Sequence, residues 1–339
     1  MSIRTSASDG SAVYHDMGIT AMKSSERGLK KVLAVLFLFS AFSFFPSAGN
    51  LYAGSALDAL DALSHSGVFS VPEPAAPAAL PGPVRSGAPL NAYFISVGQG
   101  DSEYIELPNG KNVLIDGGPN PTTSLAQFLS NHNVTRINYV VLTHPHSDHF
   151  DGLIYVFNHI SVDNFYDTRE DNSGSSTVKK LREKAQSLGV NVSYPAEGDY
   201  LDWDPGEVQV RVLNSCSQNG ASNSGAVLND CSIVLKVTYE NTSILYTGDM
   251  QSDQEARLVS TYGSQLQSDV LKVGHHGSNT ATSMEFLNAV KPKYAYIELG
   301  KDNKFGFPAP VTLSDLQAVG ATVYRTDTDG TLEFRIGGQ

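Results

Sequence analysis

Cysteine and basic residues are scarce in this sequence of 339 residues. Its two cysteines are too few for a Cys-rich zinc module or a disulfide-stapled scaffold, so any bound metal must be held by histidine and carboxylate side chains. The 23 Lys+Arg are outnumbered by 35 Asp+Glu, which gives a formal net charge of −12. A global basic surface for gripping the nucleic-acid backbone is therefore excluded, although a local basic patch is not.

The sequence also lacks internal repeats and the composition of a disordered chain. Hydrophobic residues make up 41% and charged residues 17% of it, which is typical of a folded protein. No fixed period indicates a fibre or a repeat array. The length allows two domains or one large one.

The only long apolar run, 32–45, follows Lys30 and Lys31. At about 14 residues it is shorter than the ~20 that a membrane-spanning helix needs. A basic flank, a short apolar stretch and small residues at 47–49 are together typical of a secretory signal. We therefore expect an exported protein, periplasmic or extracellular. A retained membrane anchor and a buried core helix are the alternatives.

The start and the cleavage point of this signal stay open. Met22 would give a more ordinary start than Met1, and cleavage fits after Ala53 or after Ala56. Residues 1–53 hold 5 Lys+Arg and 3 Asp+Glu, so their removal leaves 18 against 32, a formal charge of −14. The exported protein would be distinctly acidic.

Three parts are expected along the chain: a signal or anchor over 1–53, a linker over 54–89 and a folded domain over 90–339. Proline and alanine dominate 70–89. Because proline stiffens the chain and prevents regular pairing, this stretch is expected to be a tether. The remaining residues, roughly 250, suit one α/β domain.

Strand-like and helix-like segments alternate in the folded part. Strands are predicted over 91–97, 103–107, 112–116, 137–143, 208–213, 232–239, 243–246, 269–273 and 294–297. Pro108-Asn109-Gly110 is a strong hairpin signal. Helices are predicted over 124–131, 176–188, 252–262, 283–290 and 311–319. The alternation indicates two β-rich halves covered by helices, an α/β sandwich.

A cluster of metal-binding side chains, His144-Pro-His146-Ser-Asp148-His149, follows the strand predicted over 137–143. Residues two apart on an extended segment point the same way, so His144 and His146 can share one ion. The turn that follows directs Asp148 and His149 towards a second. Imidazole and carboxylate suit zinc, iron or manganese. A polar loop that happens to be rich in histidine is the weaker interpretation, because such clustering is rare by chance.

This cluster resembles the H-x-H-x-D-H signature of the metallo-β-lactamase superfamily. Further segments are similar to the hydrolase domain of ComEC-type DNA-uptake competence proteins: FISVGQGDSEYIEL followed by NVLIDGG, then SILYTGDM, then DVLKVGHHGSNTATS. The resemblance extends from about Asn91 to Phe334. It implies a four-layer αβ/βα metallo-β-lactamase-like hydrolase domain. Since no second long apolar segment matches the channel part of competence proteins, we expect a free-standing, exported relative.

The resemblance also implies ligands for two divalent metal ions, zinc or manganese. The expected ligands are His144, His146, Asp148, His149, Asp249 and His275. Asp249 matches the aspartate that bridges both ions. For the last ligand, His276 remains the alternative to His275, and the one that does not ligate is expected to contact the substrate. Asp148 and His276 are thus the expected catalytic residues.

The sequence departs from the family pattern at two places. The only histidine between His149 and Asp249 is His159, expected in a helix and structural, so a third histidine for the first ion is missing. Asn229-Asp230-Cys231-Ser232 stands there instead. The first site is therefore expected to be weaker, or to be completed by water or substrate. Gly306-Phe307-Pro308 replaces the family's Gly-His-Pro and removes a histidine that would bind substrate or act as an acid.

The implied reaction is hydrolysis of a phosphodiester by a hydroxide held between the ions. Asp148 is expected to orient this nucleophile and to take its proton as it bonds to phosphorus. Lys272 and Ser278 are candidates for contacting the phosphate, although Lys272 fits an exposed strand residue equally well. The substrate would be an anionic small molecule or nucleic acid, with no stable membrane partner and an open oligomeric state. Hydrolysis of another ester, lactam or lactone, or a non-catalytic metal-stabilised binding protein, are the alternatives.

Cys216 and Cys231 are predicted to form a disulfide. Export favours such bridges, and no third cysteine is present. The pair flanks 217–230, a run rich in serine, asparagine and glycine that would otherwise be poorly ordered. Two unpaired, partly buried thiols are the alternative.

Overall fold

The structure is a computed structural model that describes residues 87–119, 123–216 and 222–338. They belong to the second of two compact units, Ala79–Gln339. The expected signal and most of the expected linker lie outside the described residues. Within the described part, no helix combines the length and the apolar character needed to cross a membrane.

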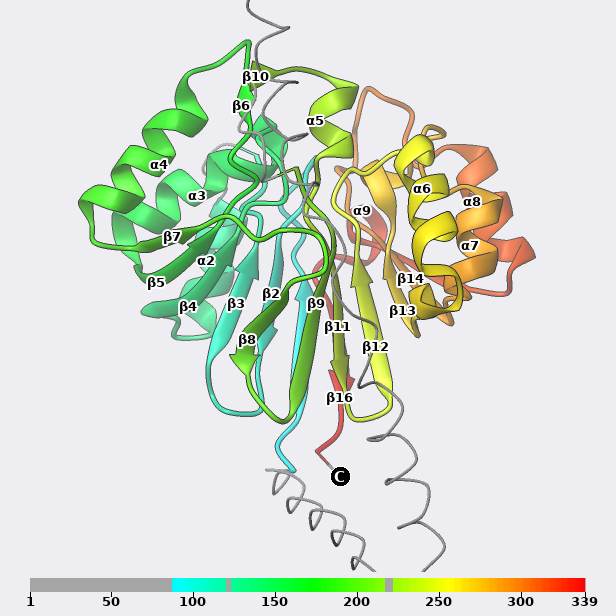
Figure 1. Cartoon of the computed structure of the whole chain (residues 1–339), viewed down its shortest axis with the longest axis horizontal. Coiled ribbons are helices and arrows are strands. Elements are labelled where there is room, and N and C mark those ends of the chain that lie inside the picture. Colours follow the sequence, from blue (N-terminus) through cyan, green and yellow to red (C-terminus); the bar gives the residue numbers. More distant parts are fainter. Residues whose placement is uncertain (1–86, 120–122, 217–221, 339) are drawn as a thin grey trace, which may run out of the picture. The chain divides into compact units, whose positions relative to one another are not determined.

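Two seven-stranded sheets make up the centre of the domain (Figure 1). The first contains β16 (Leu332–Ile336), β1 (Leu90–Phe94), β2 (Glu103–Glu106), β3 (Asn112–Ile115), β4 (Arg136–Val141), β5 (Ser161–Tyr166) and β7 (Asn191–Ser193), in that order. The second contains β15 (Thr322–Arg325), β14 (Tyr294–Ile297), β13 (Val270–Lys272), β12 (Thr242–Tyr246), β11 (Val234–Tyr239), β9 (Val208–Asn214) and β8 (Tyr200–Asp204). In each sheet a parallel half, β3-β4-β5-β7 or β12-β13-β14-β15, continues into an antiparallel half.

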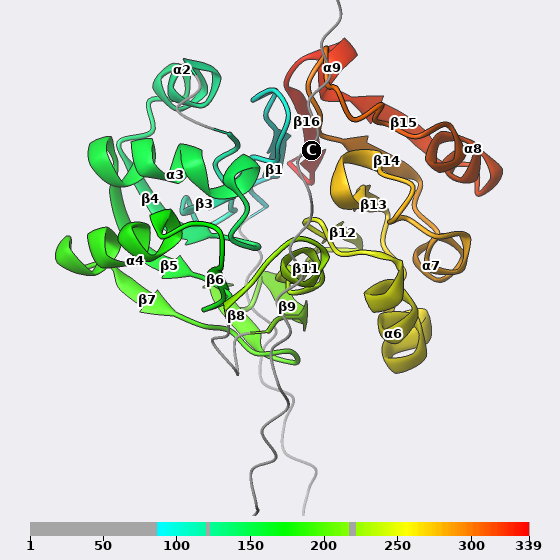
Figure 2. The ribbon, with the colours of Figure 1, turned by 90° about the horizontal axis from the view of Figure 1, so that it is seen from above.

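Helices cover the outer face of each sheet (Figure 2). The first sheet is covered by α2 (Thr123–Asn131), α3 (Ser147–His159) and α4 (Thr177–Ser187), and the second by α6 (Ser252–Tyr262), α7 (Met284–Val290) and α8 (Pro310–Ala318). Buried side chains form one apolar layer between the sheets and one beneath each group of helices. The expected four-layer αβ/βα sandwich is confirmed.

Helix α4 shows how a helix attaches to its sheet. Val178, Leu181 and Ala185 recur at helical spacing, and all three are buried against the first sheet. The lysines and glutamate between them face solvent. The same spacing predicted this helix from the sequence.

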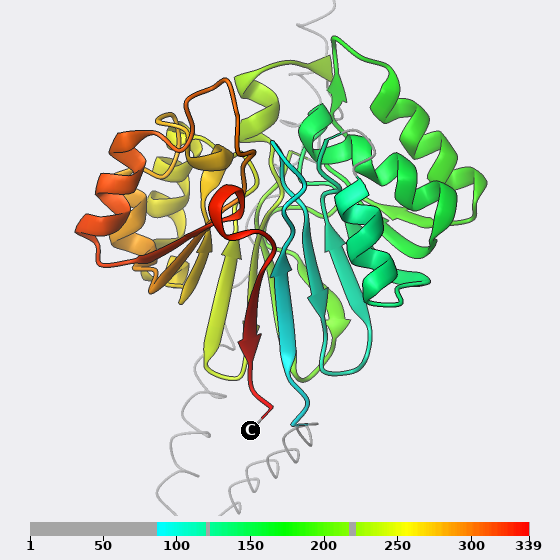
Figure 3. The ribbon, with the colours of Figure 1, turned by 180° about the vertical axis from the view of Figure 1, so that it is seen from behind.

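The last strand of the chain joins the sheet of the first half. Strand β16 pairs antiparallel with β1, with Leu90 opposite Ile336, and Figure 3 shows it, in dark red, beside the cyan β1. The two sheets therefore do not correspond to two separate halves of the sequence, because β16 closes the first sheet after β15 has completed the second.

Two short strands from different halves meet above the sheets at the top of Figure 1. Strand β6 (Asp171–Asn172) pairs in parallel with β10 (Ser222–Asn223). The segment carrying β10 and the short helix α5 (Ala226–Asp230) is closed by a disulfide between Cys216 and Cys231, so that prediction is confirmed.

Candidate metal centre

The loops that follow β3, β4, β12 and β13 meet at one end of the sandwich, at the top of Figure 1. The loop after β4 carries the signature residues, the loop after β12 carries Asp249, and the loop after β13 carries His275 and His276. Carboxyl ends of neighbouring parallel strands open at the same sheet edge, which is where α/β folds place ligands. The fold thus brings the three sequence segments together.

His144 begins the site from the loop after β4 and is fully buried. Its Nε2 lies 3.9 Å from Asp249 Oδ2. Its Nδ1 lies 3.2 Å from Thr143 Oγ1 and 3.4 Å from Ser232 Oγ. Burial, helped by nearby His149, holds the pKa of His144 well below its usual range, so the ring is neutral with one nitrogen facing the centre, as a metal ligand must be.

His146 and Asp148 form the more open side of the site. His146 Nδ1 lies 2.9 Å from His144 Nε2. Asp148 stands in the first turn of α3, so the turn expected after His146 is the start of this helix. Asp148 Oδ2 lies 3.4 Å from His276 Nε2, and 33% of the Asp148 side chain is exposed. A substrate can therefore reach the centre from this side.

His149 is held in place by Asp116, at the end of β3. Its Nδ1 lies 2.7 Å from Asp116 Oδ2, and both side chains are completely buried. Asp116 also accepts hydrogen bonds from the Thr143 backbone N–H at 2.7 Å and from its hydroxyl at 2.6 Å. Burial alone would lower the pKa of His149, but Asp249 and Asp116 outweigh it and raise that pKa well above its usual value. Such a carboxylate fixes the orientation of a metal-binding imidazole.

The Asp249 carboxylate lies among four imidazole rings. Its Oδ2 lies 3.3, 3.5, 3.8 and 3.9 Å from Nε2 of His149, His276, His275 and His144, respectively. Its backbone N–H donates to Ser232 Oγ at 3.0 Å. Burial would raise the pKa of Asp249, but His276 and His149 outweigh it and hold that pKa well below the usual range. The carboxylate is therefore ionised at the point where these four imidazoles converge.

The two adjacent histidines after β13 have different surroundings. His276 is buried, and its Nδ1 lies 3.0 Å from the Glu298 carbonyl oxygen and 3.1 Å from Asp101 Oδ1. His275 is partly exposed, and its Nδ1 lies 3.1 Å from Thr280 Oγ1. His276 belongs with Asp148, His149 and Asp249 to a group whose ligand atoms all lie within 4.8 Å. This geometry favours His276 over His275 as the last ligand, the reverse of the preference drawn from the sequence.

Behind His276, Lys272 and Asp101 form a fully buried ion pair. Lys272 Nζ also donates to the Gly248 carbonyl oxygen at 3.1 Å. The interpretation of Lys272 as an exposed strand residue is wrong, and its ammonium group faces these interior oxygens instead of an incoming phosphate. Ser278, the other expected phosphate contact, is buried, with its hydroxyl 3.0 Å from Thr280 Oγ1.

Two more buried carboxyl groups, those of Glu103 and Glu298, lie close to this ion pair. Burial and Asp101 raise the pKa of Glu298 to about 8, and burial and Glu298 raise that of Glu103 well above its usual value. Asp101, Glu103 and Glu298 are close enough together for a cation. The Lys272 ammonium group already supplies that positive charge, so we do not regard this group as a metal site.

Asn229, in α5, lies beside the histidines, in the region where a third histidine was missing from the sequence pattern. It is buried, and its Nδ2 lies 3.4 Å from His275 Nε2. Its Oδ1 is buried and has no hydrogen-bond partner among the residues that the structure describes. By contrast His159 ends α3, where its Nδ1 lies 2.8 Å from the Tyr155 carbonyl oxygen of the same helix.

Three other buried atoms at the centre lack a partner among the described residues: His149 Nε2, His276 Nε2 and Asp249 Oδ1. A buried polar atom without a partner is costly, so a native site of this kind calls for an explanation. Imidazole nitrogen and carboxylate oxygen are the donor types that bind zinc and manganese. The residues present therefore fit a divalent metal.

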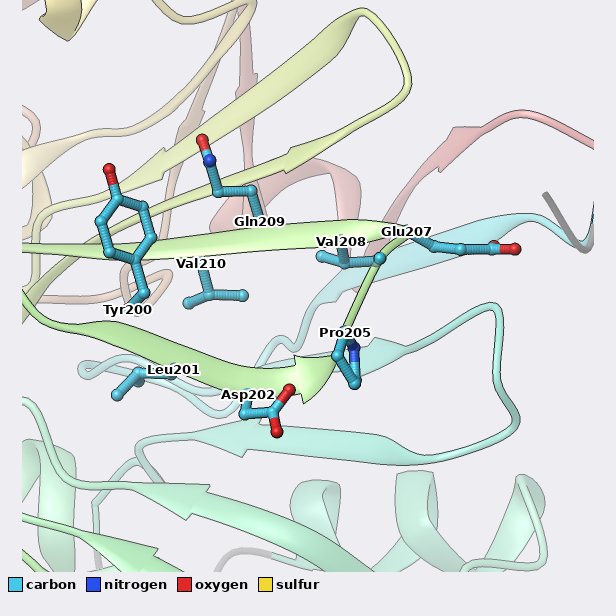
Figure 4. A pocket seen from close by; sticks show the side chains of 9 residues that line it. Tyr200, Leu201, Asp202, Pro205, Glu207, Val208, Gln209 and Val210 are labelled. Carbon is cyan, nitrogen blue, oxygen red and sulfur yellow. The ribbon is translucent and has the colours of Figure 1, made fainter. Parts of the chain in front are cut away.

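A hollow lies elsewhere, on the β8–β9 hairpin (Figure 4). It contains no histidine, and its charged side chains are those of Asp202 and Glu207. Tyr200 at its edge is 60% exposed. Its lining lacks the donor set of a metal site and a cationic group for an anion, so the histidine cluster is the better candidate for the functional site.

Comparison with known proteins agrees with this arrangement. Residues 95–300 match the family model of the metallo-beta-lactamase superfamily. The chain is similar to ComE operon protein 3 of Bacillus subtilis (strain 168), with 30% identity over 260 residues, covering 71% of this chain and 32% of the relative. It is also similar to competence protein ComA of Neisseria gonorrhoeae, with 31% identity over 256 residues, covering 74% and 33%. The chain thus spans about a third of the length of these relatives.

Among solved structures, the metallo-beta-lactamase fold protein YhfI from Bacillus subtilis is similar at 10% identity and a TM-score of 0.47, covering 72% of this chain and 99% of that one. A diphosphatase of the PhnP family is similar at 18% identity and a TM-score of 0.44, covering 73% and 99%.

Proposed function

This chain belongs to the metallo-beta-lactamase superfamily, and we propose that it is an exported phosphodiesterase that depends on two divalent metal ions, zinc or manganese. The observation that carries the proposal is the convergence of four imidazole rings on the buried Asp249 carboxylate. This donor set suits metal-dependent hydrolysis, in which bound ions lower the pKa of water and stabilise negative charge on phosphate oxygens.

The donor atoms divide into two groups around Asp249. The ligands proposed for one ion are His144 and His146, and those for the other are Asp148, His149 and His276. Asp249 would contact both. In this assignment Asn229 stands beside the first group in place of a third histidine, and its unpartnered amide oxygen supports that role.

Other residues of the chain would act on the substrate and on the ligands. Asp148, on the open side, is ionised, because the His276 ring, with Nε2 3.4 Å from Asp148 Oδ2, outweighs burial and holds the pKa of this carboxyl below its usual range. Its carboxylate can therefore orient a water molecule and accept a proton from it. His275, partly exposed beside Asp249, can contact a phosphate oxygen. Asp116 and Asp101 keep the rings of His149 and His276 in position.

A phosphodiester is the substrate that the similarity to competence protein ComA of Neisseria gonorrhoeae supports best. The formal charge of −12 disfavours long polyanions, so small diesters and short strands are the proposed substrates.

Hydrolysis of bis-p-nitrophenyl phosphate tests this function. Protein purified without chelator should contain close to two equivalents of metal, and reconstitution with zinc or manganese should give hydrolysis that a chelator abolishes. Asp249→Asn should remove the activity with little change in the far-UV circular dichroism spectrum. Metal content near zero after reconstitution, or activity only on the lactam nitrocefin, would contradict the proposal.

Export is part of the proposal and has its own test. The segment that supports it, the apolar run 32–45 with basic residues before it, lies outside the described residues. N-terminal sequencing of protein recovered outside the cytoplasm should find a start near Gly54 or Leu57. A membrane-bound form that begins at Met1 or Met22 would support a retained anchor instead.

A further inference from the structure

The loop between β14 and α8, residues 300–309, carries two stacked aromatic rings next to the metal centre. It is the orange loop near the top of Figure 1. The ring centroids of Phe305 and Phe307 are 5.6 Å apart and the ring planes differ by 19°. Phe307 packs partly against the core under the helices of the second sheet, whereas Phe305 is 57% exposed. More than half of the Phe305 side chain is therefore accessible from solvent.

The loop is held in a defined shape. The Asn303 side chain donates to the carbonyl oxygens of Gly300 and Phe307 at 3.1 and 2.8 Å, and it accepts from the Phe307 N–H at 3.0 Å. At its end, the Ala309 N–H donates to the Gly277 carbonyl oxygen at 2.8 Å. These hydrogen bonds hold Phe305 in its exposed position and join the loop to the segment that carries His275 and His276. We call the stacked rings of Phe305 and Phe307 the platform.

The platform reaches the proposed reaction site through one residue. The Phe307 ring centroid is 5.8 Å from that of His275, and His275 Nε2 is 3.8 Å from Asp249 Oδ2. In a nucleotide the base and the phosphate are separated by one sugar. A phosphate at the metal centre would therefore leave its neighbouring base near these rings.

Charge around the platform suits a phosphate backbone. Lys304 Nζ lies over the Phe305 ring, 5.9 Å from its centroid, at the end of an exposed side chain that an incoming base would displace towards its phosphate. Residues 300–309 contain Lys301 and Lys304 against a single Asp302, all exposed, in a chain with a formal net charge of −12. Exposed aromatic rings flanked by cationic side chains are the usual means by which proteins hold unpaired bases, and such stacking does not require a particular base.

We propose that Phe305 and Phe307 form a stacking subsite for an unpaired nucleobase next to the scissile phosphate, with Lys304 beside the adjoining phosphate. This proposal rests on the proposed phosphodiesterase function and narrows its substrates to nucleotides and short single strands. Bases in a duplex are already stacked on each other, so a double helix would not use the platform.

A pair of matched substrates tests the subsite. One is a single-stranded tetranucleotide, and the other has the same backbone with every base replaced by hydrogen. Loss of one base–aromatic stack is worth about 1–3 kcal/mol, so Phe305→Ala should raise KM for the tetranucleotide by roughly 5- to 150-fold. KM for the abasic strand should not change. Phe305→Trp should retain the wild-type preference for the tetranucleotide over the abasic strand. Tyr200→Ala is the matched control, because Tyr200 is 60% exposed on the β8–β9 hairpin, and it should change neither value.

Binding provides a readout that does not need turnover. Fluorescence anisotropy of a labelled tetranucleotide with metal-free protein should show the same loss of affinity in Phe305→Ala and none in Tyr200→Ala. Equal effects of Phe305→Ala on the two substrates, or no effect on either binding or KM, would overturn the subsite while leaving the phosphodiesterase function intact. If no phosphodiester is cleaved but the anisotropy difference appears, the proposed function fails and the base-stacking surface stands.

Discussion

The Lys272 ammonium group and the Asp101 carboxylate contact each other in the interior of the domain, where neither side chain is exposed. The two residues are 171 positions apart in the sequence. Lys272 also binds the Gly248 carbonyl oxygen, which precedes Asp249, while Asp101 reaches the His276 ring. One ion pair therefore positions two of the proposed metal ligands, and it joins the VGQGDS segment to the segment DVLKVGHHGS.

Breaking this pair from one side should destabilise the domain strongly. Lys272→Met leaves Asp101 as a buried charge without its partner, and removing one member of such a pair costs about 3–5 kcal/mol. The free energy of unfolding measured by urea titration should fall by this amount. The double variant Lys272→Met, Asp101→Asn should lose less than the sum of the two single variants.

The exposed pair of Lys293 and Asp269 provides the control. It joins Nζ and Oδ1 at 2.8 Å, with 72% of the lysine side chain exposed. Lys293→Met should therefore change the unfolding free energy by less than about 1 kcal/mol. Similar losses for the buried and the exposed lysine would show that the buried pair is not a structural support of the site.

Asp116→Asn should weaken metal binding while leaving every proposed ligand in place. Asp116 contacts His149 Nδ1 at 2.7 Å, and such contacts typically contribute about 10–100-fold to metal affinity. Competition with a chromophoric chelator measures the affinity directly. Asp163→Asn is the control, because Asp163 contacts Arg136 and Asn138 instead of a proposed metal ligand. Unchanged affinity in Asp116→Asn would contradict the supporting role of this carboxylate.

Buried β-branched runs were sufficient to predict the interior strands, and less regular strands were not predicted. The run INYVVLT predicted β4, whose last three residues are buried. Strands β5 (SVDNFY) and β8 (YLDWD) contain charged residues and are largely part-exposed, so they lack such a run. Strand β16 is short and half-exposed, and its partner β1 lies at the other end of the domain sequence. Local pattern carries no information on such a pairing.

The candidate site, too, was predicted from the sequence only in part. Its ligands were recognised because they occur as short segments of metal-binding residue types. Asp101 and Asp116 lie in the quoted segments VGQGDS and NVLIDGG, yet nothing local shows that they face His276 and His149 across the domain. His275 and His276 could not be distinguished, because both have left-handed backbones, with φ of 47° and 54°, whose effect on ring direction is visible only in three dimensions.

Replacing Asn229 should change the affinity for the more weakly held ion. Its unpartnered Oδ1 lies in the region where a third histidine would stand, so Asn229→His should tighten zinc binding and Asn229→Ala should loosen binding of the second equivalent. Electron paramagnetic resonance of free Mn²⁺ during a titration counts both equivalents. Val227→Ala on the same helix is the control, since Val227 is 53% exposed. If the wild type and the three variants gave identical Mn²⁺ titrations, Asn229 would not contribute to the site.

Removal of the disulfide should lower stability and also affect the site. Cys216 and Cys231 close a loop with a sequence separation of 15, for which the chain-entropy model gives roughly 3 kcal/mol. The double variant Cys216→Ser, Cys231→Ser should lose about this much unfolding free energy. Because Cys231 directly follows α5, which carries Asn229, the second metal equivalent should also bind more weakly. Dithiothreitol should lower the unfolding free energy and weaken binding of the second metal equivalent in the wild type, and it should cause no further change in the variant. Two free thiols in the unfolded, unreduced protein would refute the bridge.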